Sequence, residues 1–319
     1  MGTHSCRTSD YPRATIALAL AVGSLVCGCR REPKPTPPAT SQEARAAEPR
    51  ARARCTPDAS FRASWPIPEA SAAAEVELVP GRRELLVVSD SGNKGIVLAI
   101  PLGQSARPSE PRRFSLPLDA TTGDDLEGAA WREHALYTLT SAGAVTRFVP
   151  DGHGGLVREG PATRIGPPPY SCPKLDGVNC GKNYEGLCLR GAGDTARCVG
   201  YAASKEENAL YCVVARGADI VVDAAKPPLR LALPPRALSD CAFGAAGGPA
   251  SSTLVVTTNV HGGSVSYVVD EASGAIARLD VSGHVSNEAI AIDRDGALYQ
   301  MMDDNHEPSA GSRANCADW

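Results

Sequence analysis

One short motif recurs along this chain at nearly constant intervals, and the recurrence constrains the fold more than any other feature. Each clear copy contains a glutamate, a small residue and an apolar run: DLEGAAW (125–131), NYEGLCL (183–189) and NEAIAI (287–292). Weaker copies are SAAA (71–74) and SDCAF (239–243). Aligned on the glutamate or its substitute, the copies start at 71, 127, 185, 239 and 288, in steps of 56, 58, 54 and 49. A period near fifty residues in a strand-rich chain indicates a radial repeat.

A second recurring segment follows each copy after a turn, opens with Leu or Leu-Tyr, and has the β-branched and aromatic residues that strands prefer. These segments are 84–90, 135–141, 209–214, 253–258 and 297–303. Weaker third and fourth strands follow most of them, and four antiparallel strands per period form a β-propeller blade. The sequence therefore predicts an all-β, disulfide-stapled β-propeller of five or six four-stranded blades. A degenerate sixth blade would lie around 157–203. No strand is evident in 303–319, and 61–67 is the candidate to complete the last blade.

The first 28 residues predict a signal peptide. Arg7 and Arg13 charge its start, and 14–28 form an apolar run of 15 residues, short for a membrane span but suited to a signal-peptide core. The run leads into LVCGC (25–29), which resembles a bacterial lipobox and implies lipid attachment at Cys29. The alternative is an ordinary secretory signal cleaved nearby. We therefore expect an exported lipoprotein anchored to the outer membrane or the periplasmic face, or else a secreted protein.

Residues 29–60 are predicted to be a tether, and 61–319 the propeller domain. The tether is rich in Pro, Ala and Arg, without the apolar periodicity that a core requires. Within 30–57, seven Arg or Lys stand against three Glu, a net charge of +4. A basic segment beside a lipid anchor can lie on anionic headgroups; the alternative, which we favour, is a solvated stalk.

Charge and cysteine usage narrow the partners and the compartment. A formal net charge of −4 offers no basic face for phosphate contacts, so we expect no nucleic-acid partner. Once Cys6, Cys27 and Cys29 are set aside, an even number of cysteines remains, which favours disulfides in an exported chain. Five of them fall within 172–212, which suggests one stapled blade, and a bond between the two outermost would close the ring; the sequence leaves the pairing open. The eight are Cys55, Cys172, Cys180, Cys188, Cys198, Cys212, Cys241 and Cys316.

The glutamates of the motif are the candidate functional residues. The first strand of each blade lines the propeller axis, so Glu127, Glu185 and Glu288 are expected to converge there, with Asp240 offset by one position in the fourth copy. Converging carboxylates are costly unless a positive charge neutralises them, and Ca²⁺ takes six to eight oxygen ligands. We therefore predict a Ca²⁺ site; the alternative is that these side chains accept structural hydrogen bonds from neighbouring blades. Strand ends could supply further ligands: Asp90, Asp124, Asp303, Asp304 and Asn305.

The strings DLEGAAW and LYTLTS (136–141) together resemble the phytase-like β-propellers, the "esterase-like activity of phytase" domains, and the related SdiA-regulated propellers. KNYEGL (182–187) is similar to their third-blade motif, and EASA (69–72) with SDSG (89–92) to their opening blade. The resemblance covers about 65–305 and implies ester or phosphoester hydrolysis, Ca²⁺-dependent in some members. This chain departs from the family, because the first and fourth copies lack a glutamate in register. The nearest bases are Lys174, Lys182 and Lys205, and they form no phosphate-binding cluster, so true phytase activity is not expected.

Two functions remain after other chemistries are weighed. The chain has no nucleophile elbow or convincing serine triad, and its histidines are scattered, with His261 and His306 nearest the expected end of the axis. We favour a membrane-anchored binding module of the cell envelope, whose partner is a cell-envelope protein or a small-molecule ligand. The alternative is a Ca²⁺-dependent, phytase-like ester or phosphoester hydrolase.

Overall fold

The computed structural model describes residues 54–103, 110–191, 198–245, 247–260, 263–281, 287–303, 308–317 and 319. Within these ranges the chain forms 22 strands and no helix, so no helix there is long and apolar enough to cross a membrane. The predicted signal peptide, Cys29 and the tether up to residue 53 lie outside the described residues.

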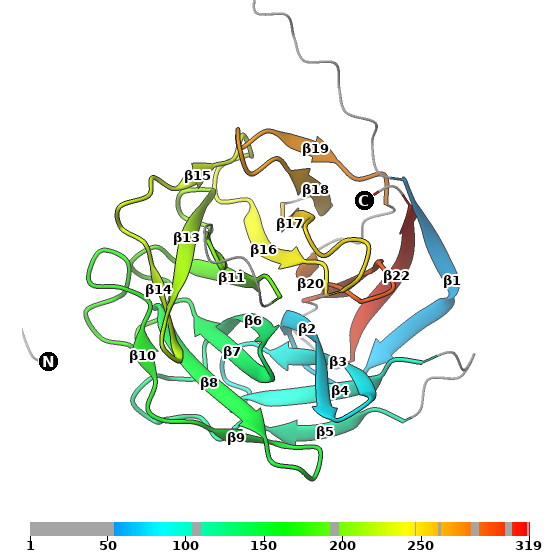
Figure 1. The fold of residues 1–319 in the computed structure, drawn as a ribbon, viewed down its shortest axis with the longest axis horizontal. Coiled ribbons are helices and arrows are strands. Elements are labelled where there is room, and N and C mark those ends of the chain that lie inside the picture. The colour runs from blue at the N-terminus through cyan, green and yellow to red at the C-terminus, as the bar shows by residue number, and fades with distance from the viewer. Residues whose placement is uncertain are drawn as a thin grey trace, which may run out of the picture. The chain divides into compact units, whose positions relative to one another are not determined.

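The strands form five antiparallel sheets, and each sheet is one blade of a propeller (Figure 1). The innermost strands of neighbouring blades contact one another around a common axis. Four blades are continuous in sequence, whereas the fifth combines the two ends of the described chain. The inner strands are β2 (Ala70–Val79), β6 (Leu126–Arg132), β11 (Tyr184–Leu189), β16 (Leu238–Phe243) and β20 (Asn287–Ile292).

Three further layers of strands follow outward from the axis in each blade. The second strands are β3 (Arg82–Ser89), β7 (Ala135–Thr140), β12 (Gly200–Ser204), β17 (Leu254–Thr258) and β21 (Ala297–Met302). The third strands are β4 (Ile96–Pro101), β8 (Ala144–Pro150), β13 (Ala209–Arg216), β18 (Val265–Val269) and β22 (Ser309–Ala317). The outer strands are β5 (Arg112–Ser115), β9 (Leu156–Arg158) with β10 (Thr163–Arg164), β14 (Asp219–Val222) with β15 (Leu229–Arg230), β19 (Ile276–Arg278) and β1 (Arg54–Trp65).

The small residue after each motif glutamate is required because inner strands of adjacent blades approach closely. A Cβ on Gly128 would lie 2.5 Å from the backbone nitrogen of Leu187, and a Cβ on Gly186 would lie 2.6 Å from Oδ1 of Asp240. Contacts that short do not occur, so only glycine fits at both places without movement of the backbone. The glycine of the recurring Glu-Gly pair is therefore explained by the close packing of neighbouring inner strands.

The hydrophobic core is divided into five clusters, and each cluster fills the space between two neighbouring blades. One example packs Leu86 and Val88 of the first blade against Leu126, Leu136 and Phe148 of the second. All five side chains are at most 1% exposed, and burying a side chain of this size contributes about 1.5–3 kcal/mol. Because each blade has two such faces, the core requires all five blades at once.

The predicted closure of the last blade by the start of the domain is confirmed, but its boundaries were wrong. The closing strand is β1, which pairs with β22 and begins at Arg54, so the predicted tether (29–60) overlaps the domain. Pro57 fits in β1 because this strand lies at the outer edge of its sheet. The region 303–319, predicted to have no strand, contains β22. Its Ser, Ala, Gly and Asn residues have low strand propensity, and the strand forms because β1 and β21 both pair with it.

The third blade also differs from the prediction. Its second strand is β12, and the segment 209–214 predicted for that place belongs to the third strand, β13. The described strands form five blades and no sixth, and those between 157 and 203 belong to the outer part of the second blade and the inner part of the third. The sequence ALY at the start of β13 imitates the second strands of other blades, which explains the error.

All eight predicted cysteines form disulfides, and the bond between the two ends of the domain, Cys55–Cys316, is among them. The expectation of one stapled blade was wrong. Only the Cys198–Cys212 bond lies within the third blade, whereas Cys172–Cys180 closes the loop before it. Cys188–Cys241 joins inner strands β11 and β16, so it crosses from the third blade to the fourth. Four disulfides indicate an oxidising environment, extracellular or periplasmic.

Candidate functional site: a cluster of carboxylates at the propeller axis

At its start, each inner strand contains one extra residue relative to its partner strand, and this residue is the one on which the sequence repeats align. The pairing register shifts at that position in all five blades. A β-bulge of this kind re-aims one side chain locally. The five bulge residues are Ser71, Glu127, Glu185, Ser239 and Glu288.

A second set of equivalent residues follows the end of each second strand, beside the bulges. In four blades the backbone N–H of this residue donates to the carbonyl two residues before the bulge, at 2.8–3.2 Å, as from Asp90 to Glu69 and from Lys205 to Asn183. The residues of this set are Asp90, Ser141, Lys205, Asn259 and Asp303. Together with Asp125, the bulge residues and this second set form what we call the axial site.

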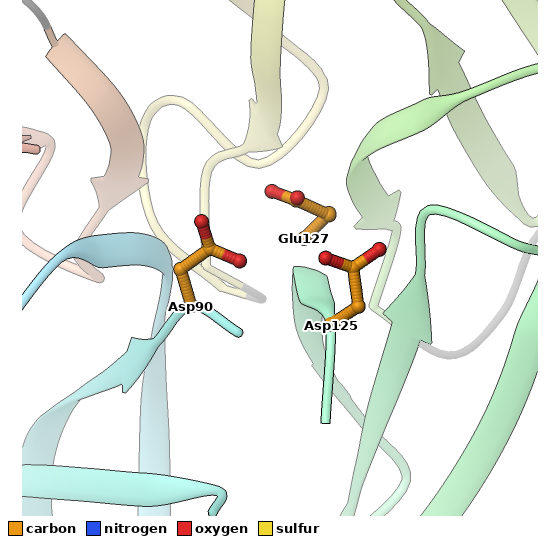
Figure 2. Close-up of side chains that lie close together, drawn as sticks. All are labelled: Asp90, Asp125 and Glu127. Carbon is orange, nitrogen blue, oxygen red and sulfur yellow. The ribbon is translucent and has the colours of Figure 1, made fainter. Parts of the chain in front are cut away.

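Three carboxylates of the axial site lie close together, those of Asp90, Asp125 and Glu127 (Figure 2). One ligand oxygen from each lies within 4.8 Å of the others, and the three come from the first two blades. Hydroxyl groups hold two of them: Ser71 Oγ donates to Glu127 Oε2 at 2.6 Å, and Ser141 Oγ donates to Asp125 Oδ2. Within the described ranges, no Lys or Arg forms an ion pair with any of the three.

Burial and mutual repulsion make these acids hard to ionise. Desolvation, followed by the charges of Asp125 and Glu288, raises the pKa of Asp90 to about 7, although the Ser91 N–H opposes this. Burial, then the charges of Glu185 and Asp90, raises the pKa of Glu127 well above its usual range. Without a compensating positive charge, part of this cluster is therefore protonated at neutral pH.

The other side of the axial site contains its own positive charge. Lys205 Nζ donates to Glu185 Oε2 at 2.7 Å. Burial nevertheless dominates, and the pKa of Glu185 rises to about 7. Asn259 Nδ2 donates to Glu288 Oε1. Burial, and then the neighbouring charge of Asp303, raises the pKa of Glu288.

Asp240 has a different set of contacts from the motif glutamates. It follows the bulge residue Ser239 and is 2% exposed. Its Oδ1 accepts from its neighbour Cys241 N–H at 2.7 Å, and its Oδ2 accepts from Ile290 N–H of the next blade at 2.8 Å. These contacts match the structural alternative considered for the motif acids, a carboxylate that joins the backbones of two inner strands.

Sequence reasoning placed the three glutamates at the axis but overlooked two residues there. Asp125 stands in the DLEGAAW motif two residues before Glu127, and that spacing was the available signal. Lys205 was noticed only as a nearby base, because the second strand of its blade was assigned to the wrong segment. The predicted candidates Asp304, Asn305, His261 and His306 lie outside the described residues.

Next to the bulge in the third blade, the sequence places a buried polar atom that has no hydrogen-bond partner among the described residues. Asn183 occupies the position two residues before its bulge, as Asp125 does in the second blade. It is 2% exposed, and its Oδ1 accepts no hydrogen bond. Buried amide oxygens normally have a hydrogen-bond donor, and none of the described residues donates to this one.

Comparison with known proteins finds distant similarity to solved structures and no family. A scan against models of known protein families finds no match, and neither does a search of curated proteins. Similar solved structures include a glutaminyl cyclase from Myxococcus xanthus, with 16% identity and a TM-score of 0.46 over 84% of this chain and 100% of that one. An α-L-arabinofuranosidase from Podospora anserina shows 13% identity and a TM-score of 0.46 over 84% and 97%. A virginiamycin B lyase from Staphylococcus aureus shows 13% identity and a TM-score of 0.38 over 75% and 66%. These are β-propeller enzymes.

Proposed function

We propose that this protein is an exported binding module of the cell envelope that takes its ligand at the axial site, together with one Ca²⁺ ion. The observation that carries the proposal is the group of Asp90, Asp125 and Glu127, whose oxygens lie within 4.8 Å of one another. No Lys or Arg in the described part of the chain forms an ion pair with any of these three. A divalent cation is the simplest group that would.

The donor set fits Ca²⁺. Calcium binds carboxylate and amide oxygens at about 2.3–2.6 Å, so two ligand oxygens on opposite sides of the ion lie at most about 5 Å apart. The three carboxylates meet this condition, and the unpartnered oxygen of Asn183 adds an uncharged candidate. The sequence also suggested Glu185, Glu288, Asp240 and Asp303 as ligands, but none of them belongs to this group of closely spaced oxygens.

The proposed location follows from the start of the chain. The lipobox-like LVCGC (25–29) supports attachment to a membrane through Cys29. The four disulfides support an exported domain. We propose that the propeller is held at the cell envelope, where its partner is an envelope protein or a small molecule.

The Ca²⁺ site is tested by thermal unfolding of the oxidised protein with Ca²⁺ and with a chelator. A cation at one hundred times its dissociation constant stabilises the folded state by about 2.7 kcal/mol, which raises the Tm of a domain of this size by about 5–10 °C. Asp125→Asn and Glu127→Gln should abolish the shift. Asp219→Asn, at an exposed carboxylate in β14, is the matched control and should keep it. Equal Tm values with Ca²⁺ and with chelator would remove the cation from the proposal.

The second candidate function is ester or phosphoester hydrolysis, favoured by two acids with pKa values raised to about 7, Asp90 and Glu185. Groups with pKa values near the working pH are suited to general acid–base catalysis, and the phytase-like motifs agree with this chemistry. A bound cation would add charge stabilisation for the reacting group. A panel of p-nitrophenyl esters and phosphates tests it: a turnover that falls at least about a hundredfold in Glu185→Gln supports the hydrolase, and absence of turnover across the panel leaves the binding module.

A further inference from the structure

The axial site is divided into two unequal halves. On the side of the first two blades, Asp90, Asp125 and Glu127 receive hydrogen bonds only from hydroxyl and backbone groups of the described residues. On the side of the later blades, Lys205 contacts Glu185 directly. Among the described residues, one half therefore contains no ion pair, whereas the other half contains the pair of Lys205 and Glu185.

Lys205 is placed to act on more than one carboxylate. Its side chain is 26% exposed and that of Glu185 is 5% exposed, so the pair at 2.7 Å is shielded from solvent. After Glu185, the charges of Glu288 and Glu127 also raise the pKa of Lys205. Its backbone is fixed by the hydrogen bond from its N–H to the carbonyl of Asn183, at 3.0 Å. The ammonium group thus lies at a set position among three acids.

We propose that Lys205 is a built-in counter-ion that limits the axial site to a single divalent cation, held on the side of Asp90, Asp125 and Glu127. The inference rests on the proposed Ca²⁺ site. An ammonium group at Glu185 occupies the oxygen that a second cation would need, and it repels such an ion. Glu185 and Glu288 are then kept away from the first ion and available to the ligand.

The direct test counts Ca²⁺ ions by calorimetric titration of the oxidised protein with Ca²⁺ alone. The wild-type chain should bind one ion, and Lys205→Met should bind two, because Glu185 would lose its ion pair and the ammonium charge near Glu185 and Glu288 would be removed. Lys205→Arg keeps the charge and should bind one. Lys174→Met makes the same charge change at an exposed lysine and should also bind one.

A double variant keeps the test decisive if Lys205→Met fails to fold. Glu185→Gln with Lys205→Met leaves no unpaired carboxylate at this position, and we expect one ion with an affinity within about threefold of the wild type. One ion of unchanged affinity in Lys205→Met, or loss of all binding in the double variant, would overturn the inference while leaving the Ca²⁺ site. A wild-type chain that binds no Ca²⁺ would overturn the proposed function and the inference with it.

Discussion

At the bulge position, the identity of one residue per blade decides what the axis contains. The three glutamates supply carboxylates, and the two serines act as hydrogen-bond donors. Ser71 donates to Glu127 of the next blade, and Ser239 donates to the backbone carbonyl of Asn287. The same β-bulge therefore places either a carboxylate or a hydroxyl group at the axis. The hydroxyl of Ser71 orients a neighbouring carboxylate, whereas that of Ser239 contacts the backbone.

The raised pKa values predict how stability depends on pH when no cation is present. In the unfolded chain, Asp and Glu titrate near 4, whereas Asp90 and Glu185 titrate at about 7 in the folded protein. Between these values the folded state binds more protons than the unfolded state, so its free energy of unfolding falls as pH rises from about 4 to 7. Asp90→Asn should make this slope shallower.

Urea unfolding in chelator at a series of pH values measures that slope. Asp219→Asn, at an exposed acid, serves as the control and should follow the wild type. Added Ca²⁺ should flatten the dependence, because it favours the ionised carboxylates. A wild-type chain and an Asp90→Asn variant with equal slopes would contradict the prediction.

At the scale of single strands, the close approach of inner strands limits substitution. Gly128→Ala would place a Cβ 2.5 Å from the backbone nitrogen of Leu187 in the next blade. Backbone cannot yield as a flexible side chain can, so we expect a loss of about 1–3 kcal/mol in the free energy of unfolding. Gly103→Ala is the control, because nothing lies within 4 Å of its added Cβ. Urea denaturation of both variants measures the difference, and equal stability would argue against close packing at Gly128.

The same scale shows how much the sequence could predict. The repeat predicted all five inner strands, because the packing at the start of each strand requires particular residue types, such as the Glu-Gly of Glu185; that its alignment position is a bulge is evident only in the structure. It failed for β12 and β22, whose Gly, Ala and Ser residues carry little strand propensity and are extended by pairing on both sides. Lys205 directly follows β12, so its position in the axial site could not be predicted once β12 was missed. A local sequence pattern thus predicts strands whose own residues favour extended structure. It misses strands that form only because neighbouring strands pair with them.

In the whole molecule, the fifth blade determines whether the propeller is closed. The inner strand β20 starts at the axial site, and three antiparallel steps lead through β21 and β22 to β1. Arg54 pairs with Ala317, so β1 begins at the end of the blade away from the axial site. The Cys55–Cys316 disulfide lies at this junction, where the two ends of the domain meet.

This disulfide should contribute more to stability than any local one, because it closes a loop of 261 residues, whereas Cys172–Cys180 closes only 8. Loop-closure entropy of the unfolded chain predicts losses of about 5.5 kcal/mol for Cys55→Ser with Cys316→Ser and about 2.5 kcal/mol for Cys172→Ser with Cys180→Ser. Guanidinium unfolding of both double variants measures this. The first variant should also become more sensitive to protease at β1, since no covalent bond then reinforces the pairing of that edge strand with β22. If the two variants lose equal stability and β1 stays protected, the core between the blades, and not the covalent link, keeps the propeller closed.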